Sequence, residues 1–149
     1  MSCFFLILVV NFKMDIRIKI YCVAENGDDC EAYGSLHFNI GNRPENQNIE
    51  IWRHERENYV TTIKYIEYHI DIERMFQETN AFTLSNTDMV TFTGEFKEQD
   101  TGIPDDLLAT ISGKPNAFVR ANEIYNTYKT ERFSEGNNYI DIVIRFTFA

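Results

Sequence analysis

Residues Met89–Ala109 read MVTFTGEFKEQDTGIPDDLLA, and we call them the deciding stretch because their pattern is the most informative about the fold. Its first part alternates, so that in an extended chain Val90, Phe92 and Phe96 share one side and polar residues share the other. Alternation of this kind is typical of a β-strand with one buried face. An acidic segment with a glycine and a proline follows, and the apolar residues after it begin a second strand. The stretch therefore predicts two strands joined by an acidic turn.

The same alternation recurs on both sides of this stretch. It is clearest in Asp15–Val23 and Asn138–Phe148, where isoleucines alternate with polar residues. Tyr59–Ile72 fits a helix as well as a strand, and its β-branched residues favour the strand. Further strands are predicted at Tyr33–Ile40, Asn48–Trp52, Phe82–Leu84 and Leu107–Ser112. About eight strands at short spacing, without a βαβ rhythm, predict an all-β fold, an antiparallel β-sandwich.

Two segments do not point to a single structure. Glu73–Glu78 fits one helical turn, and residues 117–133 fit either a helix or a strand. The predicted sandwich therefore has room for one short helix.

Length and composition set the domain organisation. The chain has 149 residues, 44% of them hydrophobic, which is enough for one domain with its own core. We assign residues 14–149 to a single β-sandwich domain. The apolar run Cys3–Val10 is too short to span a bilayer, so no transmembrane segment is predicted. Residues 1–13 are an N-terminal extension, a first strand or a signal segment.

The net charge and the cysteine content limit which partners and which disulfides are expected. The 23 acidic and 14 basic residues give a net charge of −9, and no basic stripe is present to neutralise phosphates, which excludes a nucleic-acid partner. Cys22 and Cys30 flank a turn and could form a disulfide. Three cysteines make no disulfide framework, however, and reduced thiols are the favoured interpretation.

Acidic residues gather around the turn of the deciding stretch. Residues two apart in an extended chain point the same way, so Glu98 and Asp100 project together, and Asp106 follows the turn. Converging carboxylates repel one another unless a cation lies between them. Hard oxygen ligands of this kind suit calcium better than zinc.

These residues resemble part of a known family. The segment EQDTGIPDDLLA is similar to the third calcium-binding loop of the C2 domain, a lipid-binding β-sandwich module. That family has an acid, any residue and a second acid, with a further Asp six positions on, and Glu98, Asp100 and Asp106 occupy these places. Its first loop ends in Asp-Pro-Tyr before a strand, where this chain has Glu31-Ala32-Tyr33.

The resemblance implies a calcium site and a lipid head group as the partner. Glu stands where the family has Asp at positions 31 and 98, and these longer side chains enlarge the site. The ligands that the resemblance implies are Asp28, Asp29, Glu31, Glu98, Asp100 and Asp106.

The remaining sequence patterns are weaker evidence for a functional site. The three histidines lack zinc-site spacing, and neither a Gly-x-Ser-x-Gly elbow nor a glycine-rich phosphate loop occurs. A sugar-stacking platform is less favoured than ordinary packing for the tyrosines Tyr65, Tyr68, Tyr125, Tyr128 and Tyr139. We predict a non-catalytic, C2-like module that binds a lipid or a partner through its acidic loops, assisted by calcium. The alternative is a carbohydrate- or protein-binding sandwich, such as an adhesin or toxin accessory module, without metal.

Overall fold

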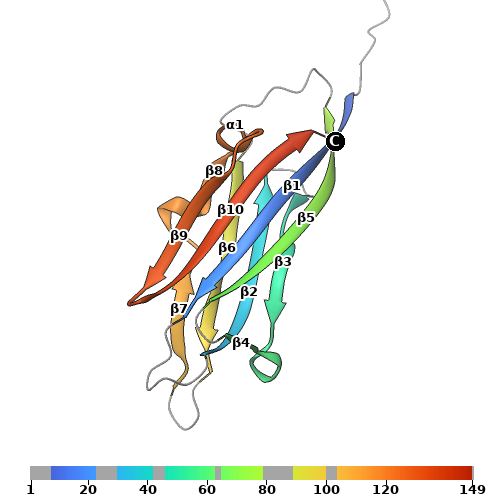
Figure 1. Ribbon diagram of the computed structural model, residues 1–149. Coiled ribbons are helices and arrows are strands. Elements are labelled where there is room, and N and C mark those ends of the chain that lie inside the picture. The colour runs from blue at the N-terminus through green and yellow to red at the C-terminus, as the bar shows by residue number, and fades with distance from the viewer. Residues whose placement is uncertain are drawn as a thin grey trace, which may run out of the picture.

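The chain folds as two antiparallel β-sheets packed face to face (Figure 1). The computed structural model describes residues 8–22, 30–41, 46–62, 65–78, 89–99 and 104–148. The predicted fold class, an all-β antiparallel sandwich, is confirmed. No helix in these described ranges is both long enough and apolar enough to cross a membrane.

The first sheet, sheet A, has four strands in the order β5–β1–β10–β9. These strands are β1 (Leu8–Tyr21), β5 (Tyr65–Glu78), β9 (Lys129–Glu135) and β10 (Asn138–Phe148). β1 and β5 pair over their whole length without a shift in register. Within the described residues, β5 and β9 are therefore the two edges of sheet A.

The second sheet, sheet B, has the order β3–β2–β6–β7, with β4 beside β2 and β8 beside β6. Its strands are β2 (Cys30–Ile40), β3 (Ile49–His54), β4 (Val60–Thr62), β6 (Met89–Glu98), β7 (Asp106–Thr110) and β8 (Phe118–Arg120). Three short helical elements complete the described structure, namely η3 (Arg56–Asn58), η4 (Pro115–Ala117) and α1 (Ala121–Ile124).

The structure revises several predicted elements. Where one strand was predicted over residues 59–72, Val60–Thr62 form β4 and residues 65–72 form the first part of β5. Residues 73–78 are strand and not a helical turn, because they pair with residues 8–13 of β1, and this tertiary pairing outweighs local preference. Residues 117–133 contain the end of η4, β8, α1 and the first part of β9. The strand predicted at residues 82–84 lies outside the described residues.

Alternate residues of the central strands form one core. β1 and β10 contribute isoleucines with no exposed surface, and β2 and β6 contribute Phe38, Phe92 and Phe96. Gly94, inside the deciding stretch, has a φ of +144°. A Cβ atom there would lie 2.0 Å from the carbonyl oxygen of Ser35, so the close approach of β2 and β6 requires glycine.

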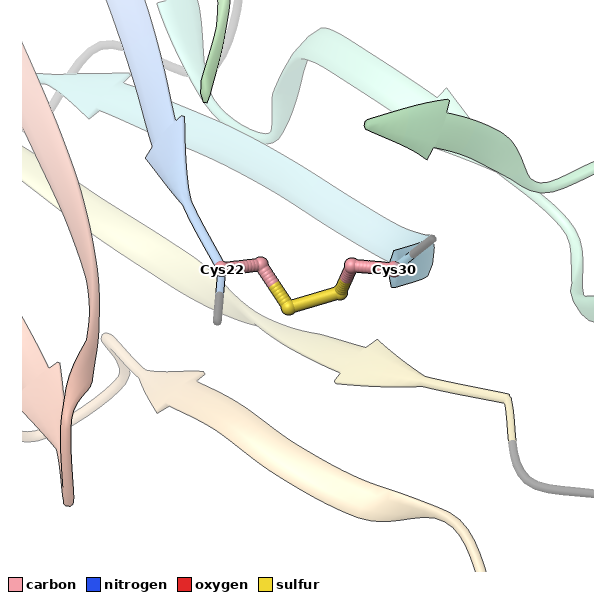
Figure 2. The surroundings of a disulfide bond; sticks show 2 residues. All are labelled: Cys22 and Cys30. Carbon is pink, nitrogen blue, oxygen red and sulfur yellow. A yellow bond between two sulfur atoms is a disulfide. The ribbon is translucent and has the colours of Figure 1, made fainter. Parts of the chain in front are cut away.

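A disulfide joins the two sheets at one end of the sandwich (Figure 2). Cys22 directly follows β1 of sheet A, and Cys30 begins β2 of sheet B. The expectation of reduced thiols was wrong, because the end of β1 and the start of β2 bring the two Cα atoms to 6.1 Å, within disulfide range. Both cysteines are fully buried.

Candidate functional site

The acidic residues singled out in the sequence lie in part at one end of the sandwich. Glu31 is at the start of β2, Glu98 at the end of β6 and Asp106 at the start of β7. The main-chain N–H of Gln99 donates to the carbonyl of Glu31 at 2.8 Å, and Glu98 pairs with Asp106 across the strands. Asp28, Asp29 and Asp100 lie outside the described residues.

The three described carboxylates do not all face the same way. Glu31 is half-buried between the fully buried Cys30 and Ala32, so it projects from the outer face of β2. Glu98 is 8% exposed and has a carboxylate oxygen within 4.8 Å of both cysteine sulfur atoms. Asp106 is exposed. Among the described residues, Glu31, Glu98 and Asp106 therefore form no three-carboxylate cluster.

This geometry limits what the described residues could hold. Calcium takes about six to eight oxygen ligands, and the described loop end offers one opposed pair, Glu98 and Asp106. Both sulfur atoms beside Glu98 are bonded to each other and supply no thiolate. The described residues alone thus do not complete a calcium site.

Tyr33, Arg56 and Asp105 form a hydrogen-bonded cluster beside the acidic end of the sandwich. The Tyr33 hydroxyl donates to Asp105 Oδ2 at 2.5 Å, and Arg56 Nε donates to the same oxygen at 2.7 Å. Burial, followed by the bond to Asp105, raises the pKa of Tyr33 to about 12. Because Arg56 balances its charge, Asp105 acts as a structural link between η3 and the segment before β7.

The outer face of sheet A carries a row of tyrosines. Tyr21 of β1 pairs with Tyr139 of β10 on one side and with Tyr65 of β5 on the other. The rings of Tyr21 and Tyr139 stack at 4.6 Å between centroids, and Tyr65 is 50% exposed. The row is accessible on the outside of the sandwich, opposite the face that builds the core.

An ion pair fixes the next row of this face. Arg132 Nε and Nη2 donate to the two carboxylate oxygens of Asp141 at 2.7 and 2.8 Å. Asp141 is buried, and its hydrogen bonds raise the pKa of Arg132. The Arg132 guanidinium lies 3.8 Å from the centroid of the Tyr139 ring, a cation–π contact. One arginine thus orients both an acid and an aromatic ring.

A second cluster forms around Asp15 near the centre of the face. The Tyr128 hydroxyl donates to Asp15 Oδ2, His69 Nε2 lies 2.7 Å from Oδ1, and Arg145 Nη2 lies 3.4 Å from Oδ2. Burial raises the pKa of Asp15, but the hydrogen bonds from Tyr128 and His69 and the nearby positive charges outweigh it and lower the pKa. Asp15 is therefore held as a carboxylate.

The Asp15 cluster is a poor metal site. Ligand atoms of Asp15, His69 and Asp71 lie within 4.8 Å of one another. However, the guanidinium of Arg145 lies 4.5 Å from the Tyr128 ring and contacts Asp15 as well. A dication at this point would be repelled by that arginine. The adjoining hollow of about 310 Å³ has basic and acidic side chains in its wall, Lys13, Asp15, Asp71, Glu73 and Arg145 among them.

The structure divides the tyrosines that the sequence grouped together. Tyr65, Tyr128 and Tyr139 contribute to the outer face of sheet A, whereas Tyr68 packs against the core. Sequence reasoning missed Tyr21 as a member of the row. The signal was present in the alternation of β1, which places Tyr21 on the side opposite its isoleucines.

Comparisons with known proteins bear on the fold alone. No family model matches the chain, and no curated protein matches it. A chain in the crystal structure of the Cry23Aa1 and Cry37Aa1 binary protein complex has a similar structure, with a TM-score of 0.57 and 22% sequence identity. The match covers 93% of this chain and 98% of that chain. The likeness supports the β-sandwich fold of this chain.

Proposed function

We propose that the chain is a non-catalytic binding module that docks a partner protein on the outer face of sheet A. The observation that supports this best is the concentration of tyrosine and arginine side chains on that face, where Tyr21, Tyr139 and Arg132 hold one another in place. Tyr and Arg are enriched among the residues that dominate binding energy at protein interfaces. Side chains ordered before binding lose less entropy when a partner docks.

The ring contacts favour a protein over a glycan as the partner. Sugar recognition by stacking needs an uncovered ring face. Tyr139 already has the Tyr21 ring stacked at 4.6 Å and the Arg132 guanidinium at 3.8 Å. The Tyr128 ring likewise has Arg145 at 4.5 Å and Arg17 at 5.4 Å. The mixed charges between these rings suit a protein surface with complementary charges.

Two further observations support a non-catalytic, partner-binding role. Asp15 is stabilised in its charged form by three neighbouring side chains, which makes it a weak base. The Cry23Aa1–Cry37Aa1 structure shows the same fold in a protein that assembles with a second protein. We extend that property, binding to another protein, to this chain.

Reconstitution from purified components tests the proposal. A partner captured from the source organism would be identified, purified and titrated against the chain in the presence of a chelator. We expect a stoichiometric complex that the double variant Tyr21→Ala, Tyr139→Ala weakens by at least about tenfold. The matched control is Tyr59→Ala, because Tyr59 is also an exposed tyrosine but precedes β4 of sheet B. A complex indifferent to the double variant, or binding to glycans alone, would contradict the proposal.

Calcium-assisted, C2-like binding at the loop end is the second candidate. It is supported by Glu98 and Asp106, two carboxylates directly opposite each other with one of them buried, a placement of like charges that a cation would stabilise. Glu98 and Asp106 would contribute two oxygen ligands. Millimolar calcium would then raise the melting temperature of the wild-type chain and of the control Glu135→Gln, but not of Glu98→Gln. An unchanged melting temperature in the wild-type chain would remove this candidate.

A further inference from the structure

We infer that the strand β5 is a docking edge, to which an extended segment of the partner protein adds as a fifth strand of sheet A. The segment would carry basic side chains on the outer face of the sheet and apolar side chains on the inner face. This inference rests on the proposed function, because it names the part of the module and the kind of partner segment that meet.

The backbone of β5 offers a long template for such pairing. β5 has 14 residues, and within the described part of the chain it pairs with β1 alone. A strand paired on one side presents a row of unused N–H and C=O groups on the other side. Extended peptides bind to such edges through main-chain hydrogen bonds.

The other edge strands in the described residues are shorter or irregular. β3 has 6 residues and a register shift against β2, and β7 has 5 residues and a register shift against β6. β9 has 7 residues. Short strands, bulges, prolines and charged side chains, lysines especially, are the usual protection of an edge, and the acidic side chains of β5 would protect it against all but a basic segment. β5 contains no proline, glycine or lysine, and its register with β1 is unbroken.

The inner side of β5 leaves apolar surface for a further strand to cover. Ile66, Tyr68, Ile70 and Ile72 are only partly buried. Their pairing partners on β1 are almost completely buried, namely Ile20, Ile18, Ile16 and Met14. An added strand with apolar inner side chains would bury this remaining surface and gain the hydrophobic free energy.

A cluster of aromatic rings lies behind this edge. Trp52 of β3 is 5% exposed. Its ring meets that of Tyr68 edge-on at 5.8 Å, and it stacks on Phe96 at 4.8 Å. Apolar side chains of a segment added beside β5 would extend this cluster, because Tyr68 is only partly buried.

The charges on the outer side of β5 indicate the charge that the partner segment should carry. The exposed residues of β5 include Glu67 and Asp71, whereas β1 carries Arg17 and Lys19 on the same face. Opposite charges on neighbouring strands stabilise a sheet, and like charges oppose it. The next strand beyond β5 should therefore be basic, which also suits a chain with a net charge of −9.

The same charges disfavour a second copy of this chain as the occupant. In an antiparallel pairing of two β5 strands centred on His69, Glu67 of each copy would face Asp71 of the other. Directly opposed acids are destabilising. A partner protein with a basic strand meets no such penalty.

A peptide of defined chemistry tests the edge directly. The probe is a capped, labelled peptide of about ten residues that alternates lysine with valine, a typical length for strand pairing. We expect it to bind the intact chain and to slow amide hydrogen exchange in β5 but not in β9. Replacing its lysines by glutamate should weaken binding at least about tenfold, and methylating alternate backbone nitrogens should abolish it.

Two variants of the chain make a matched pair. Glu67→Lys should weaken binding of the lysine peptide about fivefold, because it replaces an attraction by a repulsion. Glu135→Lys makes the same change of charge at an exposed position on the other edge strand, β9, and should leave the affinity unchanged. Sedimentation of the chain without peptide detects pairing between two copies.

The outcomes separate this inference from the proposed function. Absence of peptide binding, binding without protection of β5, or equal effects of Glu67→Lys and Glu135→Lys would overturn the docking edge. Self-association through β5 would overturn it in favour of a second copy. A complex with the partner protein that still requires Tyr21 and Tyr139 would, in that case, leave the proposed function standing. Peptide binding at β5 without any complex with a partner protein would support the docking edge and contradict the proposed function.

Discussion

Among the described residues, the two edges of sheet A differ, because β9 is covered by other side chains whereas β5 is open. At β9, Phe133 is 3% exposed, and the side chain of Asn116 donates to the carbonyl of Arg132 at 2.7 Å. Lys129 lies between Glu123 and Glu131, at 2.5 and 3.4 Å. At β5, apolar side chains are half covered and the strand is twice as long, 14 residues against 7. Length alone does not protect an edge, whereas side chains that cap its backbone and core do.

The largest contrast should appear when one apolar side chain is removed from each edge. Phe133→Ala should lower the free energy of unfolding by about 3–4 kcal/mol, because it leaves a cavity in a fully packed position. Ile70→Ala should lower it by about 1–2 kcal/mol, because half-buried Ile70 loses less contact. Urea unfolding of the two variants measures both. Equal losses would mean that β5 is as well packed as β9.

The disulfide between Cys22 and Cys30 should have the next largest effect. The double variant Cys22→Ala, Cys30→Ala should lose about 2.5 kcal/mol of unfolding free energy, since the disulfide closes a short loop between the sheets. Hydrogen exchange should rise in both β5 and β9, because the disulfide joins sheet A to sheet B and belongs to neither edge. Faster exchange confined to one edge would contradict this view. Unfolding with and without a reductant provides the control.

The third prediction isolates the ion pair beside the closed edge. Arg132→Ala should cost about 1–2 kcal/mol, because it leaves the buried Asp141 without its two charge-assisted hydrogen bonds. The matched control is Arg53→Ala, which removes an exposed arginine from ion pairs with Glu50 and Glu55 and should cost less than about 1 kcal/mol. If both variants lose the same amount, the Asp141 pair contributes no more than a surface ion pair.

The smallest effect should be a pH dependence of the unfolding free energy that arises from Asp15, in the middle of sheet A. The folded state lowers the pKa of Asp15 below its ordinary value of 3.8. The carboxylate therefore contributes stability above the unfolded pKa, and this contribution is lost as the pH falls through the folded pKa. Between pH 5 and pH 2 the unfolding free energy of Asp15→Asn should fall less steeply than that of the wild type. Parallel curves would show that Asp15 contributes nothing to acid sensitivity.

The sequence predicts the local pattern of this fold better than its long-range contacts. Alternation located β6 and β10 because the buried and exposed sides of a strand are encoded two residues apart. The strand at residues 73–78 was missed because it depends on pairing with the beginning of β1. The disulfide was missed for a similar reason, since its geometry depends on how β1 and β2 cross between the sheets.

The candidate site shows the same limit. The acidic loops stand out in the sequence because their residues are close together along the chain. The tyrosine row does not, because Tyr21, Tyr65 and Tyr139 become neighbours only through the register of three strands. Local pattern places each tyrosine on a face, and only the pairing of the strands shows that they meet. The ligands predicted at Asp28, Asp29 and Asp100 lie outside the described residues and stay predictions.

Hydrogen exchange of the reconstituted partner complex, measured in a chelator, tests the central claim most directly. We expect slower exchange in β5 and in the neighbouring strands β1 and β10, with no change at the loop end that contains Glu31, Glu98 and Asp106. Protection confined to that loop end, appearing only when calcium replaces the chelator, would contradict it. In that case the calcium-assisted loop, and not the open edge of sheet A, would be the binding site.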